Sequence, residues 1–518
     1  MELRPRTTQE TPEAQVIPIR LLTAVADARN GGCGLRVSRD GGLSWTTTAL
    51  NLLPANFQFC VQRTYGIDMA PAFAPDGTLY VAMPASSVAT GHPNGPISLV
   101  VARTSDLGIT HHSSVVESAR SGDTYTLPDG SKAIGLEQDK LPSIAVDPAN
   151  PKTVFVSWRL TIRGPNQVPV PGYSLGGPNN AIPSRTMVAV SHDGGVTWSK
   201  PIDVMDRYKP EHVFGSGAAS LVTASDGTVY GFTRESPKPV GKGQPKPSAR
   251  LFTFSSADGE KTWQTSVISP GVQQSDDPQA AIAPDGRIYV AYPARGASTL
   301  SNAPPNPSNV FVLSSAHGKT WSQPVDIVDP QARQADQYLP GVSVAPDGRV
   351  DVAFYDFRND PFFGPGGLGN MNAAVAERYW DVYVTHSSDS GATWAPDTRV
   401  TEAPIYDKVG ITFNNEDIRG PMGVASINPA TYVAWPDTRA TTAPNSDAED
   451  AYFSRVRFVA PAHLGAATGG SKWWAWGVGG LAVGLAAGGA GLLASRRSLN
   501  RAGRRSGPRM SPPVATAT

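Results

Sequence analysis

Arginine and carboxylate side chains recur along this chain in two fixed sequence contexts. Arginines follow short apolar runs, at Arg29, Arg159, Arg234, Arg295, Arg358 and Arg439. Carboxylates precede other apolar runs, at Asp68, Asp139, Asp276, Asp277, Asp336, Glu416 and Asp417, and Tyr338 stands beside one of them. Arginine forks bind carboxylates through paired hydrogen bonds, so these residues, gathered at one opening, would form an anion-binding pocket that also bears acids.

A second interpretation of the same pattern is structural. Each arginine could pair with an aspartate of the neighbouring repeat and so bridge two repeats. Regular recurrence favours such a bridge, because catalysis needs different residues in different repeats, whereas a structural motif repeats everywhere. Both interpretations stay open at the level of the sequence.

A short turn pattern repeats along the chain and dictates the architecture. Ser/Thr-x-Asp-x-Gly-x-Thr/Ser-Trp occurs at 37–45, 190–198, 255–263, 314–321 and 386–394, with a degraded copy at 103–111. Asp accepts backbone hydrogen bonds in a tight turn, Gly adopts positive φ, and Trp packs on the hairpin. We therefore expect the aspartates and tryptophans of these turns to be structural: Asp40, Asp193, Asp258, Asp389, Trp45, Trp198, Trp263, Trp321 and Trp394.

Four strands are expected around each turn. Over 139–203 they fall at 141–146, 154–158, 186–191 and 197–204, and hairpins with central Asp-Gly recur at 71–83, 220–232, 280–292 and 342–354. We predict an all-β fold, a six- or seven-bladed β-propeller of four-stranded antiparallel blades over 15–458. The repeated turns would then lie on the bottom rim. The start of each first strand and the end of each second strand would lie on the top face.

The repeated turn resembles the Asp box, or BNR repeat, of sialidases and related propellers, over roughly 15–458. The resemblance implies three arginines that hold the sialic acid carboxylate, a Tyr nucleophile polarised by a Glu, and an Asp acid/base. The residues that would carry these roles are Asp139, Asp336, Tyr338 and Glu416 for catalysis and Arg159, Arg234, Arg358 and Arg439 for substrate binding. No cofactor is implied, and no metal-ligand spacing is found.

The chain departs from the sialidase pattern at two places. Ile17-Pro18-Ile19-Arg20 stands where the family has Arg-Ile-Pro, and no Tyr precedes the first strand of the last unit. Tyr338 is the best substitute, followed by Tyr406 and Tyr65, and Glu416 and Glu235 are the expected partners. Two functions remain: an extracytoplasmic exo-α-sialidase-like glycoside hydrolase that removes terminal sialic acid or a related acidic sugar, and a non-catalytic surface propeller that binds glycans or proteins.

The C-terminal region predicts a membrane anchor. After a linker at 459–472, residues 473–494 carry no charge, begin with a tryptophan cluster and precede a basic tail at 495–518. Such a stretch crosses ~30 Å of hydrocarbon as a helix, and the positive-inside rule puts the tail in the cytoplasm. We expect a single-pass cell-membrane protein with its propeller outside. The small-residue run Gly480, Gly484 and Gly488 could pair two helices in a homodimer.

The start of the chain conflicts with export. Residues 1–30 lack a basic segment followed by an apolar one, so we expect the N-terminal segment 1–14 to be truncated and a signal peptide to be missing. Cys33 and Cys60 would form a disulfide in an exported propeller, and two buried thiols are the alternative. The formal net charge is +0, with 17% charged residues, and nothing indicates a nucleic-acid partner.

Overall fold

The computed structural model divides into two units, Met1–Ala460 and Pro461–Thr518. It describes residues 21–27, 32–38, 40, 44–49, 52–57, 59–60, 69–86, 96–126, 132–163, 184–206, 213–237, 249–274, 277–295, 307–333, 335–360, 379–406, 422–437 and 450–458. All of these belong to the first unit. No helix in these ranges is long and apolar enough to cross a membrane. The linker, the predicted span at 473–494 with its glycines, and the basic tail lie outside the described residues.

The first three sheets are antiparallel and follow one another along the chain. They contain β1 (Leu21–Asp27), β2 (Gly32–Ser38) and β3 (Thr46–Ala49); then β4 (Phe59–Cys60), β5 (Ala70–Phe73), β6 (Leu79–Ser86), β7 (Ser98–Thr104) and β8 (His112–Glu117); then β9 (Ser121–Thr126), β10 (Lys132–Val146), β11 (Val154–Arg163), β12 (Arg185–Ser191) and β13 (Ile202–Asp203).

The remaining strands form three further antiparallel sheets. A nine-stranded sheet contains β14 (Val213–Ser216), β15 (Ser220–Thr223), β16 (Val229–Pro237), β17 (Ala249–Ser256), β18 (Gln264–Gln274), β19 (Gln279–Ile282), β20 (Ile288–Arg295), β21 (Ser308–Ser315) and β22 (Val325–Asp326). The last two sheets contain β23 (Gln337–Val344), β24 (Val350–Asp356), β25 (Tyr379–Ser387), β26 (Thr398–Arg399) and β27 (Ile405–Tyr406); and β28 (Gly423–Ile427), β29 (Ala430–Asp437) and β30 (Asp450–Arg457).

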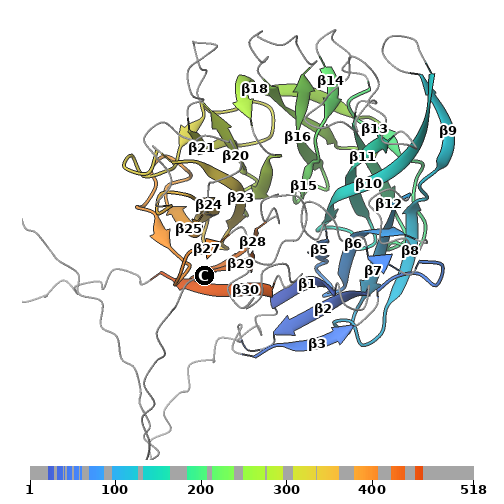
Figure 1. Ribbon diagram of the computed structural model, residues 1–518, viewed down its shortest axis with the longest axis horizontal. Helices are drawn as coiled ribbons and strands as arrows, with labels where there is room; N and C mark the ends of the chain where they lie inside the picture. Colours follow the sequence, from blue (N-terminus) through green and yellow to red (C-terminus); the bar gives the residue numbers. More distant parts are fainter. Residues whose placement is uncertain are drawn as a thin grey trace, which may run out of the picture. The chain divides into compact units, whose positions relative to one another are not determined.

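Within the first unit, one strand of each successive group contacts its counterpart in the next. β5 contacts β10, β10 contacts β15, and the series continues through β19 and β23 to β28, around the centre of the view in Figure 1. The described elements are therefore all strands, in sheets arranged as a propeller requires. The number of blades stays a prediction.

The ends of the series also meet. Trp45, just before β3, packs edge-on against Phe453 of β30 with ring centroids 5.3 Å apart, and it lies beside Ala430 and Tyr432. An aromatic pair of this geometry adds to the burial of both rings. The first and last sheets of the described chain are therefore neighbours.

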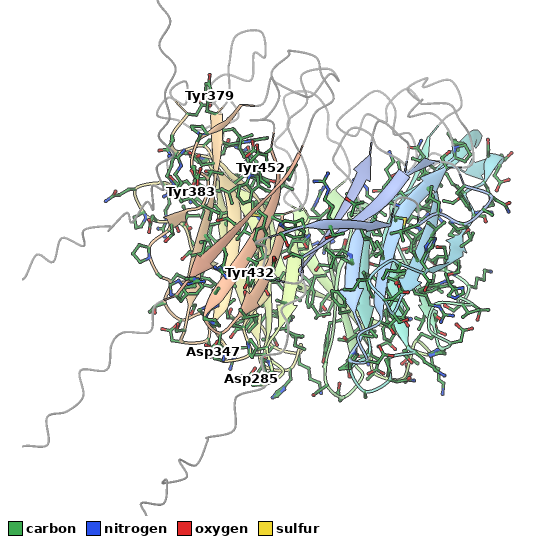
Figure 2. All side chains as sticks on the ribbon, turned by 90° about the horizontal axis from the view of Figure 1, so that it is seen from below. Asp285, Asp347, Tyr379, Tyr383, Tyr432 and Tyr452 are labelled. Atoms are coloured by element: carbon green, nitrogen blue, oxygen red, sulfur yellow. The ribbon has the colours of Figure 1, made fainter. Side chains whose placement is uncertain are left out.

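Two kinds of turn lie at one edge of the sheets. In the Asp-Gly hairpins, Gly77 and Gly286 have φ near +86°, and Asp76 and Asp285 accept the backbone N–H two residues later at 2.9 Å. Figure 2 shows Asp285 and Asp347 together at this edge, which we call the turn rim, and Tyr379 at the opposite edge, which we call the loop rim. β20 ends and β23 begins at the loop rim.

The repeated turns lie at the turn rim as well, because Gly194 donates to the carbonyl of Lys152 in the adjacent hairpin at 2.9 Å. In five of the six copies an aspartate accepts hydrogen bonds from the backbone N–H and the hydroxyl of the Ser or Thr four residues later, at Asp40, Asp106, Asp193, Asp258 and Asp389. The copy at 314–321 has no aspartate. These hydrogen bonds favour the charged form of the carboxyl. They hold the pKa of Asp258 and of Asp389 at about 2.

Apolar side chains fill the space between neighbouring sheets. Trp158 of β11 is fully buried with Leu99 and Val101 of β7, and Phe354 of β24 packs with Val310 and Val312 of β21. Strands β6 and β24 are buried along their whole length, and β24 buries Asp351 and Asp356 together with its apolar residues.

The sheets are less regular than the predicted set of four-stranded blades. β18 pairs with β17 through most of its length and then with β20 through Gln273 and Gln274, so two groups of strands merge into one sheet. β10 likewise extends towards Lys132 and pairs with β9. β18 continues through Ser269-Pro270-Gly271, a sequence that would predict a turn, so its extension was not expected from the sequence.

Candidate functional site

The candidate site lies at the loop rim, where strands such as β16 and β20 end and the next innermost strands begin. The structure describes six of the eight proposed site residues: Asp139, Asp336, Tyr338, Arg159, Arg234 and Arg358. Glu416 and Arg439 lie outside the described residues. Cys33 and Cys60 are placed in β2 and β4, which contact each other, but their side chains are not described.

Tyr338 is held by a carboxylate and a guanidinium. Its hydroxyl donates to Oδ2 of Asp336 at 2.9 Å and accepts from Nη2 of Arg295 at 2.6 Å. Asp336 is completely buried and also accepts from the backbone N–H of Ser308 at 2.6 Å, whereas Tyr338 is half-buried. A phenol in contact with both a base and a cation is arranged as an activated nucleophile.

A bulge in β23 produces this arrangement. The pairing with β24 shifts register between Tyr338 and Gly341, and the intervening Leu339 has φ +48°, a region that non-glycine residues rarely occupy. β10 has the same irregularity at Leu141, with φ +51°, before Pro142. Bulges commonly re-aim a side chain beside an active site, and here the Leu-Pro pair at 339–340 does so for Tyr338.

A second arginine is fixed nearby through β16 and β17. Arg250 donates to both carboxylate oxygens of Glu235, at 2.8 and 2.7 Å, and its backbone N–H donates to the same group at 2.9 Å. Glu235 is 3% exposed, so this pair is a bidentate, largely desolvated contact. Arg250 is thereby held in one orientation.

The merged sheet places Arg250 and Arg295 on either side of β18. Ala249, beside Arg250, lies opposite Val272 of β18, and Arg295 lies opposite Gln273 of the same strand. Since paired residues on adjacent strands are about 5 Å apart, the backbones of the two arginines flank one stretch of β18 at roughly 10 Å. This placement depends on the extension of β18 that the sequence did not predict.

Arg234 takes part in a bridge between consecutive strand groups. Its Nε donates to Oδ1 of Asp277, just before β19, at 2.8 Å, and both side chains are about one-fifth exposed. Arg295 and Asp336 repeat this relationship one step further along the chain, at 3.4 Å. Arg234 therefore acts as a bridge between neighbouring strand groups, as the structural interpretation of the recurring arginines predicts. Arg295 forms such a bridge and also donates a hydrogen bond to Tyr338.

Arg358 binds carboxylates from two sheets. Its guanidinium donates to Asp356 and Asp397, each at 2.6 Å, lies 3.9 Å from Asp329, and stacks on the ring of Tyr383. Burial raises the pKa of Asp356 and of Asp397, and the contacts with Arg358 oppose that rise. Asp329 and Asp397 adjoin outer strands, so Arg358 bridges the outer parts of neighbouring sheets.

Asp139 is buried beneath Trp158. The indole Nε1 donates to Oδ1 at 2.7 Å, while Oδ2 has no partner among the described residues, and the side chain is 0% exposed. Burial raises the pKa of Asp139 well above its usual range. Arg159 lies in the middle of β11, opposite Lys140 of β10. The Asp139 carboxyl does not face solvent here.

Two contacts of the site could not be predicted from the sequence pattern. Arg250 begins a strand rather than ending one, so it falls outside the recurring arginine context, and its pairing with Glu235 across two strands follows only from the register. Arg295 belongs to the recurring set, yet its contact with Tyr338 depends on the bulge. In the ranges that the structure describes, no group of three or more His, Cys, Asp or Glu side chains could hold a metal ion.

The repeated-turn tryptophans pack at the interfaces between sheets. Trp198 donates to Ser114 of β8, Trp263 and Trp321 contact Phe254 and Phe232, and Trp394 lies against the apolar cluster shared by β21 and β24. None of these rings approaches the loop-rim residues described above.

No family model matches the chain, and no curated protein matches it. Similar solved structures include sialidases and trans-sialidases. The Hadza microbial sialidase Hz136 matches with 16% identity over 79% of this chain and 72% of its own, at a TM-score of 0.44. A leech intramolecular trans-sialidase has 12% identity over 84% and 82%, at 0.42, and that of Ruminococcus gnavus has 12% over 78% and 96%, at 0.43.

Proposed function

We propose that this chain is a glycoside hydrolase of the sialidase kind, with Tyr338 as its nucleophile. One observation carries the proposal: the Tyr338 hydroxyl lies between a buried carboxylate, Asp336, and a guanidinium, Arg295. A nucleophile is activated by an adjacent base, and a neutral phenol avoids the repulsion that a carboxylate nucleophile would meet from an acidic sugar.

The first step follows from these contacts. Tyr338 Oη attacks the anomeric carbon and forms a C–O bond as the glycosidic bond breaks, and the phenolic proton passes to Oδ2 of Asp336. Arg295 stabilises the negative charge that develops on the phenolic oxygen. A second carboxylic acid must protonate the leaving oxygen, and Glu416 is the proposed group. Water then hydrolyses the tyrosyl–sugar bond.

An acidic sugar is the proposed substrate because several arginines stand at this rim. Arg250, oriented by Glu235, lies across β18 from Arg295. A guanidinium fixed in advance loses little freedom when it binds a carboxylate. We assign Arg250 this role together with Arg159 and Arg439.

The experiment is fluorophore release from a sialic acid glycoside by the full chain and by Tyr338→Phe. Turnover by the wild type that disappears in Tyr338→Phe supports the proposal. The matched control is Tyr230→Phe, which removes a hydroxyl that contacts the carbonyl of His317 at the turn rim. A folded wild type without turnover on any acidic glycoside would contradict it.

A non-catalytic glycan- or protein-binding propeller is the second candidate. It is favoured by the pairing of Arg234 with Asp277 and of Arg358 with Asp356 and Asp397, because these arginines already satisfy carboxylates of the protein itself. Retention of ligands on a glycan array without turnover would support it.

We also propose that residues 473–494 anchor the propeller outside the cell membrane, with 495–518 in the cytoplasm. The uncharged span and its basic flank support this. Proteolysis of intact cells that removes the propeller, together with membrane retention of the C-terminal fragment, is the expected result.

A further inference from the structure

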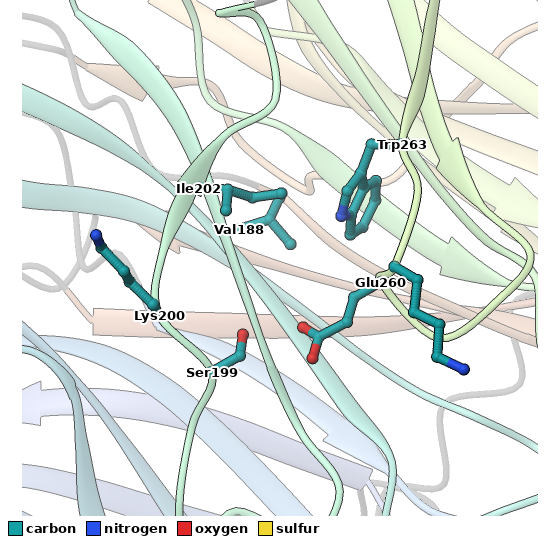
Figure 3. A pocket seen from close by; sticks show the side chains of 7 residues that line it. Val188, Ser199, Lys200, Ile202, Glu260 and Trp263 are labelled. Atoms are coloured by element: carbon teal, nitrogen blue, oxygen red, sulfur yellow. The ribbon is translucent and has the colours of Figure 1, made fainter.

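A cavity of about 270 Å³ opens at the interface between the third sheet and the nine-stranded sheet, at the turn-rim end of β17. Val188, Ser199, Lys200, Ile202, Glu260, Lys261 and Trp263 line it (Figure 3). It is far from the candidate catalytic residues, since Arg250 begins β17 and the turn bearing Trp263 follows its end. At about 3.4 Å per residue, the two places are roughly 20 Å apart.

The equivalent interface, between the second and third sheets, shows which contact is made at this position. There, Ser114 of β8 accepts a hydrogen bond from Trp198 Nε1 at 2.9 Å and donates to the carbonyl of Gly195 at 2.7 Å. One hydroxyl thus joins an indole donor and a turn carbonyl across two sheets.

The register identifies the equivalent residue at the cavity. Ser114 lies opposite Val101, which stands three residues before Thr104, the first conserved position of that repeated turn. Ile202 lies opposite Val188, which stands three residues before Ser191, the same position of the next turn. Trp263 and Glu260 stand where Trp198 and Gly195 stand in the neighbouring turn. The apolar Ile202 therefore replaces the serine, and the bridging hydroxyl is lost.

The replacement leaves a buried donor beside an open space. Trp263 is 9% exposed, and its Nε1 has no hydrogen-bond partner among the described residues. Figure 3 shows that edge of the indole turned towards Val188 and Ile202. The Nε1 atoms of Trp321 and Trp394 also have no hydrogen-bond partner among the described residues. An unpaired indole alone therefore does not indicate a binding site. The cavity beside Trp263 is the second observation.

Glu260 adds a strained carboxylate to the cavity wall. It has φ +87°, where the same turn position is occupied by glycine in three other copies, Gly108, Gly195 and Gly391. Side chains cost about 1–2 kcal/mol in this region, and such strain often marks functional sites. The Glu260 carboxylate faces Ser199 in Figure 3, while the ammonium group of Lys200 points away from the space between them.

We propose that this cavity binds one neutral sugar residue of a glycan. A sugar hydroxyl takes the place of the Ser114 hydroxyl, accepting from Trp263 Nε1, and further hydroxyls bond Glu260 and Ser199. The C–H face of the sugar packs on Ile202, a residue that is 40% exposed. Glu260, which lies 3.5 Å from His192 Nε2, would repel a sugar carboxylate placed beside it, so we expect a neutral sugar to be preferred. The volume suits a single ring better than an oligosaccharide.

Calorimetric titration of the full chain with the methyl glycosides of glucose, galactose, mannose and N-acetylglucosamine, and with free N-acetylneuraminic acid, tests the proposal. We expect saturable binding of at least one neutral glycoside, on the order of 1 mM for a single ring. Ile202→Ser restores the hydroxyl of the neighbouring interface and should weaken this binding about tenfold. Trp263→Phe, which removes the N–H donor together with part of the aromatic ring, should weaken it at least about fivefold.

The matched control is Ile109→Ser, at an apolar residue that is 70% exposed on another turn, and it should leave the affinity unchanged. Tyr338→Phe should also leave it unchanged, which separates this site from the proposed catalytic one. The proposal is overturned if none of the four neutral glycosides binds, if binding survives both Ile202→Ser and Trp263→Phe, or if N-acetylneuraminic acid is the ligand that Ile202→Ser displaces.

Discussion

Oδ2 of Asp336 accepts the hydroxyl hydrogen of Tyr338 at 2.9 Å, and the carboxylate that does so has no exposed surface. Tyr338 itself is half-buried, so a substrate that reaches the phenolic oxygen does not have to reach the base. A base that is hydrogen-bonded to its nucleophile and shielded from water is positioned for proton transfer at the moment of attack.

The proton acceptor can be tested separately from the nucleophile. Asp336→Asn keeps the shape of the side chain but cannot take the phenolic proton, so kcat on an acidic glycoside should fall about 10²–10⁴-fold. Asp326→Asn is the control, since Asp326 also pairs with an arginine, Arg333, away from Tyr338. Equal activity of Asp336→Asn and the wild type would remove Asp336 from the mechanism.

Arg349 ties the last sheet to its neighbour. It is 6% exposed, pairs with the fully buried Asp351 at 2.8 Å, and donates to the carbonyl of Ile427 at 2.8 Å. Arg349→Met leaves Asp351 buried and unpaired, so the free energy of unfolding should fall by about 3–5 kcal/mol. Urea titration measures this, and Asp351→Asn in the same chain should recover part of the loss.

The backbone strain at Glu260 should lower the free energy of unfolding by a measurable amount. Glu260→Gly should raise the free energy of unfolding by about 1 kcal/mol, because glycine adopts positive φ without steric cost. Gly391→Ala, at the equivalent place in another turn, should lower it by a similar amount. A loss of stability in Glu260→Gly would show that contacts of the side chain outweigh the strain.

The aspartates of the repeated turns should make the protein less stable at acidic pH. The folded-state pKa of Asp258 and of Asp389 is lowered to about 2, below the value of about 3.9 in an unfolded chain. Their contribution is therefore present above pH 4 and is lost as the pH falls towards 2. Thermal melting from pH 5 to pH 2 should show this decline, and Asp258→Asn with Asp389→Asn should flatten it.

The contribution of Asp139 to stability changes with pH in the opposite direction. Burial raises its pKa, so the folded state binds the proton more tightly than the unfolded chain, and its contribution to stability decreases as the pH rises above 4. Asp139→Asn should therefore stabilise the protein more at pH 8 than at pH 4. An equal change in melting temperature at both pH values would mean that Asp139 is charged when folded.

Local patterns predicted the strands and turns of this fold well. Asp-Gly pairs marked the hairpins, and the spacing from Asp193 to Thr197 contains the whole hydrogen-bonding scheme of its turn. The loop rim was harder, because contacts there join residues far apart in the sequence. Nothing near Arg250 indicates Glu235 as its partner, and the contact of Arg295 with Tyr338 requires both the bulge at Leu339 and the extension of β18.

The contact between Trp45 and Phe453 has a consequence for the order of events during synthesis. The first sheet leaves the ribosome long before its neighbour in the final sheet has been translated. Until then its outer surface stays uncovered, and the two rings can meet only by closing nearly the whole chain into a loop. Contacts of such high sequence separation form slowly. We expect the nascent protein to depend on chaperones or export factors that shield this early sheet until β30 emerges.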